Sequence, residues 1–162
     1  MTSIIRFLFG LYFLLLRLVG GKSVGARALV LSPDRKKVLL VYHTYCPRWH
    51  LPGGGVKRKE HPVDAVQREI YEEAGIRCLE PPLLFGIYYQ KYRHADDYPL
   101  VYIVSQWVQE KVTSPEIKDC QWFYIHALPY DMDPGSRSRI EEYCFGSNVS
   151  LYWNPQKNED IK

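Results

Sequence analysis

Residues 54–76 read GGVKRKEHPVDAVQREIYEEAGI, and this stretch decides the fold of the chain. Pro62 near its start and Gly75 at its end are typical first and last signals of a helix. Between them, apolar residues recur at helical spacing and form one stripe, consisting of Val63, Val66, Ile70 and Ala74. The stretch therefore predicts a glycine turn followed by an amphipathic helix that ends at Gly75.

Three glutamates lie close together on the predicted helix. Glu69, Glu72 and Glu73 are three and four residues apart, so they project from one neighbouring face. Like charges at these spacings repel, and acidic side chains near a helix C-terminus oppose the helix dipole. Arg68 offsets one charge, and the remaining carboxylate oxygens suit a hard divalent cation such as Mg²⁺. The alternative is an acidic helix face that water solvates.

The whole stretch resembles the Nudix box. Every defining position of that motif is matched, namely by Gly54, Glu60, Arg68, Glu69, Ile70, Glu72, Glu73, Gly75 and Ile76. The resemblance implies an α/β fold, an α/β/α sandwich with a mixed β-sheet, over most of residues 25–145. It also implies a hydrolase that cleaves a diphosphate bond in a nucleoside diphosphate linked to another group, with Mg²⁺ or Mn²⁺ as cofactor.

The resemblance further implies a set of site residues. The expected metal ligands are the main-chain carbonyl of Gly53 and the carboxylates of Glu60, Glu69, Glu72, Glu73 and Glu116. Glu69 or Glu116 would be the general base. Arg68 would not bind the metal itself but would orient the helix through an ion pair with Glu60. Glu116 is selected by its spacing to Trp122, with Asp119 in reserve.

Four side chains are candidates for contact with the substrate. Aromatic rings can stack on a base and an arginine can bind phosphate, and the candidates are Tyr42, Tyr89, Tyr92 and Arg93. The alternative is ordinary packing for the strand tyrosine and solvated loop side chains for the others. The expected partner is a nucleotide-type diphosphate. The dispersed basic residues and the formal net charge of +3 predict no stable nucleic-acid partner.

The chain begins with an apolar segment. Residues 4–19 are almost wholly apolar apart from Arg6 and Arg17, but their uncharged run is shorter than the roughly 20 residues that span a bilayer. No convincing signal-peptide cleavage site follows. Two interpretations remain open, a helix at the membrane interface or a helix that packs on the domain or on a second copy in a homodimer.

The remaining organisation is simple. We expect residues 1–20 to form the apolar element, residues 24–153 the catalytic domain, and residues 154–162 a polar tail. Four cysteines without metal-site spacing predict free thiols in a cytoplasmic protein. The protein could associate with a membrane through its N-terminal segment.

Four local features are predicted outside the central stretch. Residues 25–32 and 37–43 read as a hairpin around a turn at residues 32–36. Residues 89–99 read as a polar hairpin loop, and residues 110–119 read as a second loop. A last helix starts near Asp133 and reaches Tyr143. His61 stands at the N-cap of the central helix, where imidazole is a weaker cap than Ser, Thr or Asp.

Two functions of other classes compete with hydrolysis. The same fold could serve as a non-catalytic nucleotide-binding sensor, which loss of the box carboxylates would favour. It could also serve as a membrane-associated interaction module whose main element is the N-terminal segment. None of the box carboxylates is missing, so hydrolysis is the preferred interpretation.

Overall fold

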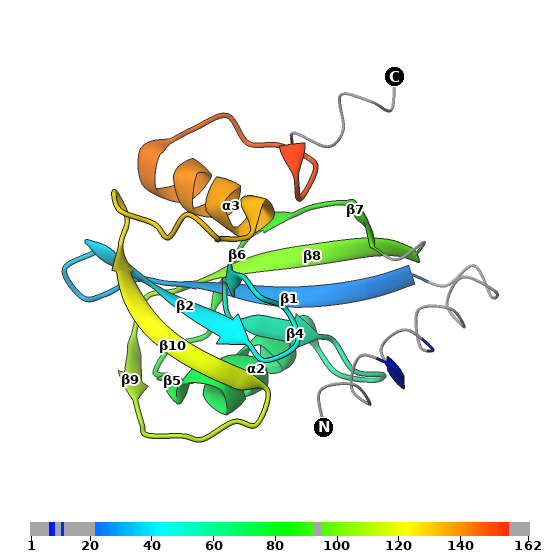
Figure 1. Cartoon of the computed structure of the whole chain (residues 1–162), viewed down its shortest axis with the longest axis horizontal. Coiled ribbons are helices and arrows are strands. Elements are labelled where there is room, and N and C mark those ends of the chain that lie inside the picture. The colour runs from blue at the N-terminus through cyan, green and yellow to red at the C-terminus, as the bar shows by residue number, and fades with distance from the viewer. Residues whose placement is uncertain (1–6, 9–10, 12–21, 93–94, 156–162) are drawn as a thin grey trace.

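The computed structural model describes residues 7, 8, 11, 22–92 and 95–155. Figure 1 shows a central sheet with helix α2 (Pro62–Ala74) on one side and helix α3 (Pro134–Phe145) on the other. This arrangement confirms the predicted α/β/α sandwich.

The central sheet is mixed. Its order is β4-β1-β8-β6, and β7 also pairs with β8. β1 (Lys22–Val30) runs parallel to β8 (Ala95–Val104) and antiparallel to β4 (Gly53–Gly55). β6 (Leu83–Ile87) and β7 (Gln90–Tyr92) are both antiparallel to β8.

Two smaller sheets complete the fold. β2 (Lys37–His43) lies between β10 (Ile117–Tyr124) and β3 (Trp49–His50), and all pairings are antiparallel. β5 (Ile76–Cys78) pairs with β9 (Trp107–Gln109). β5 follows α2 directly, so this small sheet lies at the end of the helix that carries the glutamates.

Helix α2 has the predicted bounds, and both of its ends are capped. The side chain of His61 accepts a hydrogen bond of 3.3 Å from the backbone N–H of Val63, so imidazole does cap this helix. Gly75 adopts the left-handed conformation with φ 68°, and its N–H bonds to the carbonyls of the last turn. The caps hold the C-terminal turn of the helix in one place.

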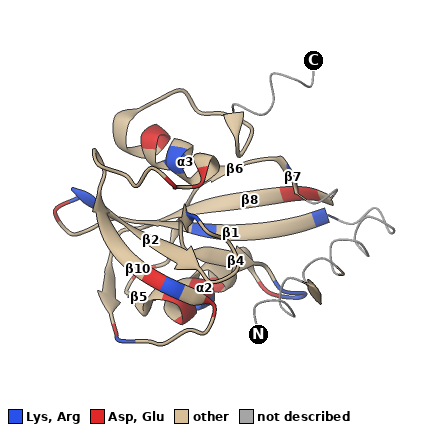
Figure 2. Cartoon of the chain, in the orientation of Figure 1, with Lys and Arg blue, Asp and Glu red and all other residues tan. Residues whose placement is uncertain are grey.

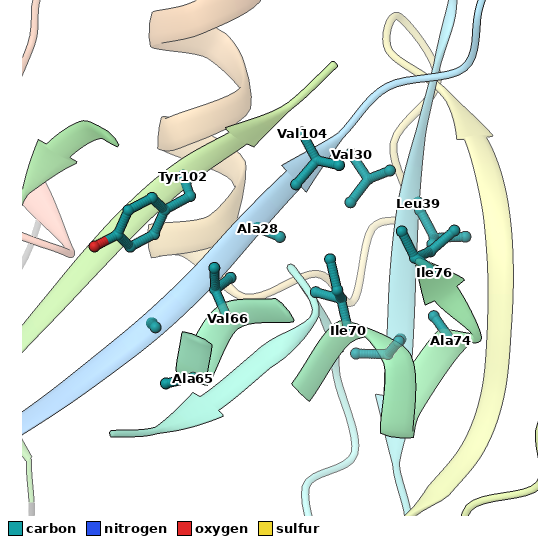
Figure 3. Close-up of a cluster of buried hydrophobic side chains, with 12 residues drawn as sticks. Ala28, Val30, Leu39, Ala65, Val66, Ile70, Ala74, Ile76, Tyr102 and Val104 are labelled. Carbon is teal, nitrogen blue, oxygen red and sulfur yellow. The ribbon is translucent and has the colours of Figure 1, made fainter. Parts of the chain in front are cut away.

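Apolar side chains fill both spaces between the sheet and the helices. Val66, Ile70 and Ala74 of α2 belong to one buried cluster with Ala28 and Tyr102 of the sheet. In Figure 3, Val66 lies below Ala28, and Ala74 lies near Ile76. A second cluster lies between the sheet and α3, and its buried members include Leu29, Leu40, Met132, Ile140 and Trp153. The sheet is thus covered on both faces.

The predicted hairpin is wrong. β1 and β2 lie in different sheets and share only an isolated bridge between Leu31 and Val38. β1 cannot pair with β2 along its length because β4 and β8 occupy its two edges. The hairpin predicted for residues 89–99 is present, since β7 pairs antiparallel with the start of β8, but most of its residues lie in these two strands and not in a loop. The loop before β10 and the last helix are present.

Some predictions fall outside the described residues. Most of the apolar segment 4–19, Arg93, and residues 156–162 of the polar tail belong to this group, and the domain boundaries stay predictions. Phe7, Leu8 and Leu11 are described and exposed. In the part of the chain that the structure describes, no helix is both long and apolar enough to cross a bilayer. All four cysteines are free thiols.

Candidate active site

The carboxylate of Glu73 lies where α2 meets the glycine strand β4. Glu73 is only 8% exposed, although it belongs to the acidic face of the helix. Its Oε2 accepts a hydrogen bond of 2.7 Å from the backbone N–H of Gly53. Figure 2 shows the acidic residues of α2 beneath the central sheet, beside β4 and β10. The three glutamates therefore differ strongly in environment, since Glu72 is exposed and Glu69 is half-buried.

Burial raises the pKa of Glu73 to about 8. The hydrogen bond from Gly53 and the positive charge of Arg27 act in the opposite direction, whereas the negative charges of Glu69 and Glu116 raise the pKa further. A buried carboxyl group with a raised pKa lacks enough positive charge around it. The site would therefore be stabilised by an additional cation.

His43 lies on the other side of Glu73. Its Nε2 is 3.7 Å from Oε1 of Glu73, and the side chain is buried. Burial lowers the pKa of His43 to about 3, with smaller contributions from the charges of Arg27 and His50. The imidazole is therefore neutral at pH 7, and its Nδ1 has no hydrogen-bond partner among the described residues.

Arg68 forms hydrogen bonds with several residues on the more exposed side of the site. It donates to both oxygens of Glu60, at 2.7 and 3.0 Å, so the expected ion pair is present. It also donates to Glu69 at 2.6 Å, to Glu72 at 3.5 Å and to the carbonyl of Gly55 at 3.2 Å. The contact with Arg68 lowers the pKa of Glu60 to about 2. Arg68 thus ties the helix to the loop that precedes it.

Gly54 allows the helix to approach this loop. A Cβ atom added at Gly54 would collide with the carboxyl group of Glu69, whereas one added at Gly55 would meet no atom within 4 Å. The second glycine of the triplet is therefore needed for the position of Glu69. Glycine is required at position 53 for another reason, because its φ of +137° is a backbone conformation that other residues rarely adopt.

Glu116 is brought to the site by the end of β2. Its backbone carbonyl accepts hydrogen bonds from the N–H of Thr44 at 2.8 Å and from Thr44 Oγ1 at 3.2 Å. Its exposed carboxylate raises the pKa of Glu73. The reserve candidate, Asp119, instead accepts from the backbone of Cys120 and from Gln121.

Sequence reasoning missed Arg27. This residue of β1 donates a hydrogen bond to the carbonyl of Gly53, the backbone oxygen expected to bind metal. Its charge also acts on His43, Tyr45 and Glu73. A usable signal was present, because Arg27 is the only charged residue between Lys22 and Asp34 in an otherwise apolar strand pattern.

The tyrosine candidates are separated by the fold. Tyr42 packs edge-on against Trp49, and the amine of Lys118 lies 5.4 Å from its ring centre. Tyr89 contacts the rings of Tyr98 and Tyr152 and donates to Asp96. Tyr92 is exposed on β7. Tyr89 therefore has a packing role between β8 and the C-terminal segment.

The donor set suits a hard divalent cation. It offers a buried carboxyl group that lacks positive charge, further carboxylates at its edge, and the carbonyl of Gly53, and such oxygen ligands are the ones Mg²⁺ binds. Within the described ranges, no three acidic, histidine or cysteine side chains stand close enough together to hold a metal ion. Arg68 occupies the space among the outer carboxylates, and Arg27 is bound to the carbonyl of Gly53.

Several curated proteins are similar in sequence. An RNA pyrophosphohydrolase of Bartonella henselae is 46% identical over 57 residues, which are 35% of this chain and 29% of that protein. Diphosphoinositol polyphosphate phosphohydrolase 2 of Rattus norvegicus is 34% identical over 108 residues, which are 65% of this chain and 60% of that protein. The chain thus spans less than two thirds of the length of these relatives.

Solved structures are similar in fold. A MutT NUDIX hydrolase from Burkholderia pseudomallei superimposes with a TM-score of 0.66 at 27% identity, over 74% of this chain and 96% of that one. A NUDIX hydrolase from Nitrosomonas europaea superimposes with a TM-score of 0.66 over 80% of this chain and 93% of that one. At 23% identity, the second likeness shows the fold alone.

The family itself follows from the sequence match. The sequence model described as the NUDIX domain matches residues 21–143, which are most of the chain and include the glycine strand, α2 and Glu116. The fold and the arrangement of the box residues agree with that match. This chain belongs to the Nudix family.

Proposed function

We propose that the protein is a metal-dependent hydrolase that cleaves the diphosphate bond of a nucleoside diphosphate linked to another group, by attack of water on phosphorus. The observation that carries this proposal is the carboxyl group of Glu73, which is held by the N–H of Gly53 and whose pKa is raised to about 8 by burial and by the nearby charges of Glu69 and Glu116. A structural role alone would favour an apolar residue there, because burying an uncompensated carboxylate is unfavourable. The relatives named as pyrophosphohydrolases support the same reaction class.

The chemistry requires positive charge near the diphosphate. Its oxygens repel an incoming nucleophile, and bound Mg²⁺ or Mn²⁺ would neutralise them and lower the pKa of a bound water. Glu72, Glu73 and the carbonyl of Gly53 would hold the cation. Glu60, Glu69 and Glu116 would complete the ligands.

The proton of the attacking water needs an acceptor. Glu69 and Glu116 are the two candidates, and both lie at the edge of the site, half-buried and exposed respectively. Arg68 keeps Glu69 beside the glycine strand through its contact of 2.6 Å. A carboxylate at the boundary between protein and solvent can return the proton to water.

The reaction can be tested with a substrate panel. Phosphate release would be measured with Mg²⁺ or Mn²⁺ on nucleoside triphosphates, nucleotide sugars and dinucleoside polyphosphates. The panel would also include an RNA with a 5′-terminal pyrophosphate and a diphosphoinositol polyphosphate, because two relatives are named for such substrates. We expect metal-dependent cleavage of at least one compound. Metal-independent release, or none with a folded protein, would contradict the proposal.

The N-terminal segment has a separate proposed role. We propose that residues 4–19 attach the domain to a membrane interface or pair it with a second copy, because an apolar surface of this size is seldom left in water. Removal of residues 1–19 should convert the protein into a monomer that does not bind lipid. Lipid cosedimentation and sizing would test this, and identical behaviour of both chains would remove the idea.

A further inference from the structure

The guanidinium of Arg27 lies where a metal ion bound to the carbonyl of Gly53 would be expected. It faces Gly53 directly in the antiparallel pairing of β1 and β4, and its Nη1 donates to the carbonyl of Gly53. The side chain is half-buried. The carbonyl that would bind a cation is therefore already bound to a guanidinium.

A cation and Arg27 cannot both be accommodated at this oxygen without repulsion. A divalent ion on the carbonyl of Gly53 would place two positive groups within contact distance, and a partly buried site screens that repulsion less than water does. Binding of the cation must therefore displace the guanidinium of Arg27 from the carbonyl.

Arg68 provides an internal comparison. Both arginines reach a carbonyl of the glycine strand, Arg27 at Gly53 and Arg68 at Gly55. Arg68 is also held by both oxygens of Glu60. Among the described residues, Arg27 forms no ion pair with a carboxylate, in contrast to Arg68. Arg27 is therefore the arginine that can leave its carbonyl at lower cost.

The displaced guanidinium needs an anion. Its charge already acts on Glu73, His43 and Tyr45, so the side chain lies near the buried carboxyl group of Glu73. A diphosphate held by the cation would bring phosphate oxygens to the same place. Guanidinium and phosphate form paired, charge-assisted hydrogen bonds, which are stronger than the bond to a neutral carbonyl.

We propose that Arg27 is a substrate-binding residue that covers the carbonyl of Gly53 before the cation binds and moves to the diphosphate when it does. This inference rests on the proposed function, since it assumes that the cation and a diphosphate meet at this site. It means that Arg27 opposes binding of the cation alone and favours binding of the diphosphate with the cation. The cation and the diphosphate then reinforce each other's binding.

The test compares two affinities in one variant, Arg27→Gln. Binding of Mn²⁺ alone would be followed by the loss of the free Mn²⁺ signal in electron paramagnetic resonance. Binding of α,β-methylene-ADP, whose phosphorus atoms are joined by carbon and cannot be cleaved there, would be measured at saturating Mn²⁺. We expect Mn²⁺ to bind about three- to tenfold more tightly and the analogue about tenfold more weakly than in the wild type.

A matched control exists on the opposite face of the sheet. Arg137 of α3 is half-buried and donates to the carbonyl of Pro129 at 2.8 Å, which is the same kind of contact as that of Arg27. Arg137→Gln should leave both affinities within about twofold of the wild type, because its charge lies away from the acidic helix. Should Arg27→Gln fail to fold, Arg27→Met keeps the length of the stem and gives the same comparison.

The opposite signs of the two changes distinguish this role from a structural one. A folded Arg27 variant in which both affinities fall, or neither changes, would overturn the inference while leaving the hydrolase proposal in place. A wild-type chain that neither binds Mn²⁺ nor cleaves any diphosphate would overturn the hydrolase proposal, and the role of Arg27 would be rejected with it.

Discussion

The backbone N–H of Gly53 donates a hydrogen bond of 2.7 Å to Oε2 of Glu73, and this contact joins the glycine strand to the last turn of α2. It gives one oxygen of a buried carboxyl group a fixed position. The other oxygen lies 3.7 Å from Nε2 of His43. Glu73 is therefore oriented by the fold before any cation binds, which is what a ligand at a catalytic centre requires.

Replacing Glu73 by glutamine should separate catalysis from folding. Glutamine retains an oxygen that can accept from Gly53 but carries no charge for a cation. We expect Glu73→Gln to lower metal-dependent hydrolysis by about a hundredfold or more while the fold is kept. Steady-state kinetics and circular dichroism would measure the two effects.

The control for this variant is Glu80→Gln. Glu80 is exposed and accepts a hydrogen bond from Gln106 outside the site, so its charge should not affect turnover. Retention of wild-type turnover by a folded Glu73→Gln protein would show that Glu73 does not hold the cation.

The stability of the metal-free protein should fall as the pH rises from about 7 to 8. The pKa of Glu73 is about 8 in the folded chain against an ordinary value of 4.5, so between these values the folded protein keeps a proton that the unfolded chain has released. Rising pH then favours unfolding, with a limiting slope of about 1.4 kcal/mol per pH unit for one proton. Denaturant titrations at several pH values would measure the slope.

At lower pH, His43 and His50 make the stability of the folded protein rise with pH, which is opposite to the effect of Glu73. Burial lowers the pKa of His43 to about 3 and that of His50 to about 4, so below 6.5 the unfolded chain binds more protons and stability rises with pH. This effect is half lost at pH 6.5 and nearly gone by about pH 7.5, so the slope due to Glu73 is obtained as the difference between the wild type and Glu73→Gln. Glu73→Gln should remove the fall in stability between about pH 7 and 8. Added Mg²⁺ should stabilise the wild type more as the pH approaches 8, and pH profiles that coincide for the two proteins would contradict the assignment.

Adding one methyl group at Gly54 should disturb the site, whereas the same change at Gly55 should not. A Cβ at Gly54 collides with the carboxyl group of Glu69, and a Cβ at Gly55 points into open space. Neither glycine has a positive φ, so alanine causes no backbone strain at either position. We expect Gly54→Ala to lower kcat about tenfold or more, because Glu69 must move, and Gly55→Ala to change it less than about twofold. Equal kinetics of the two variants would mean that the position of Glu69 does not matter.

A better cap at His61 should stabilise the protein without affecting catalysis. His61 accepts from Val63 N–H at 3.3 Å, a long hydrogen bond, and Ser is a stronger N-cap. We expect His61→Ser to raise the free energy of unfolding by about 0.5–1 kcal/mol and His61→Ala to lower it. Urea denaturation would measure both changes. A serine variant less stable than the wild type would indicate that the imidazole has a further role.

The sequence by itself determined the central helix and the acidic residues that it carries. Pro62, Gly75 and the apolar stripe predicted the bounds at which α2 begins and ends, and the box spacing predicted which glutamates the helix carries. These signals are local, because capping and helical periodicity depend on residues within a few positions of one another. The ion pair of Arg68 with Glu60 was implied by the resemblance to the Nudix box, and the structure contains it.

Only the tertiary structure decided which strands pair and which side chains surround Glu73. The turn at residues 32–36 predicted a hairpin, but β1 pairs with β8, far along the chain, because both faces of that parallel pair can be buried between the helices. The pairing of β1 with β4 places Arg27 opposite Gly53, 26 residues away in the sequence. Glutamates of the same helix differ in burial because the sheet covers Glu73 and leaves Glu72 in water. Such contacts join distant parts of the chain, and no local pattern of residues encodes them.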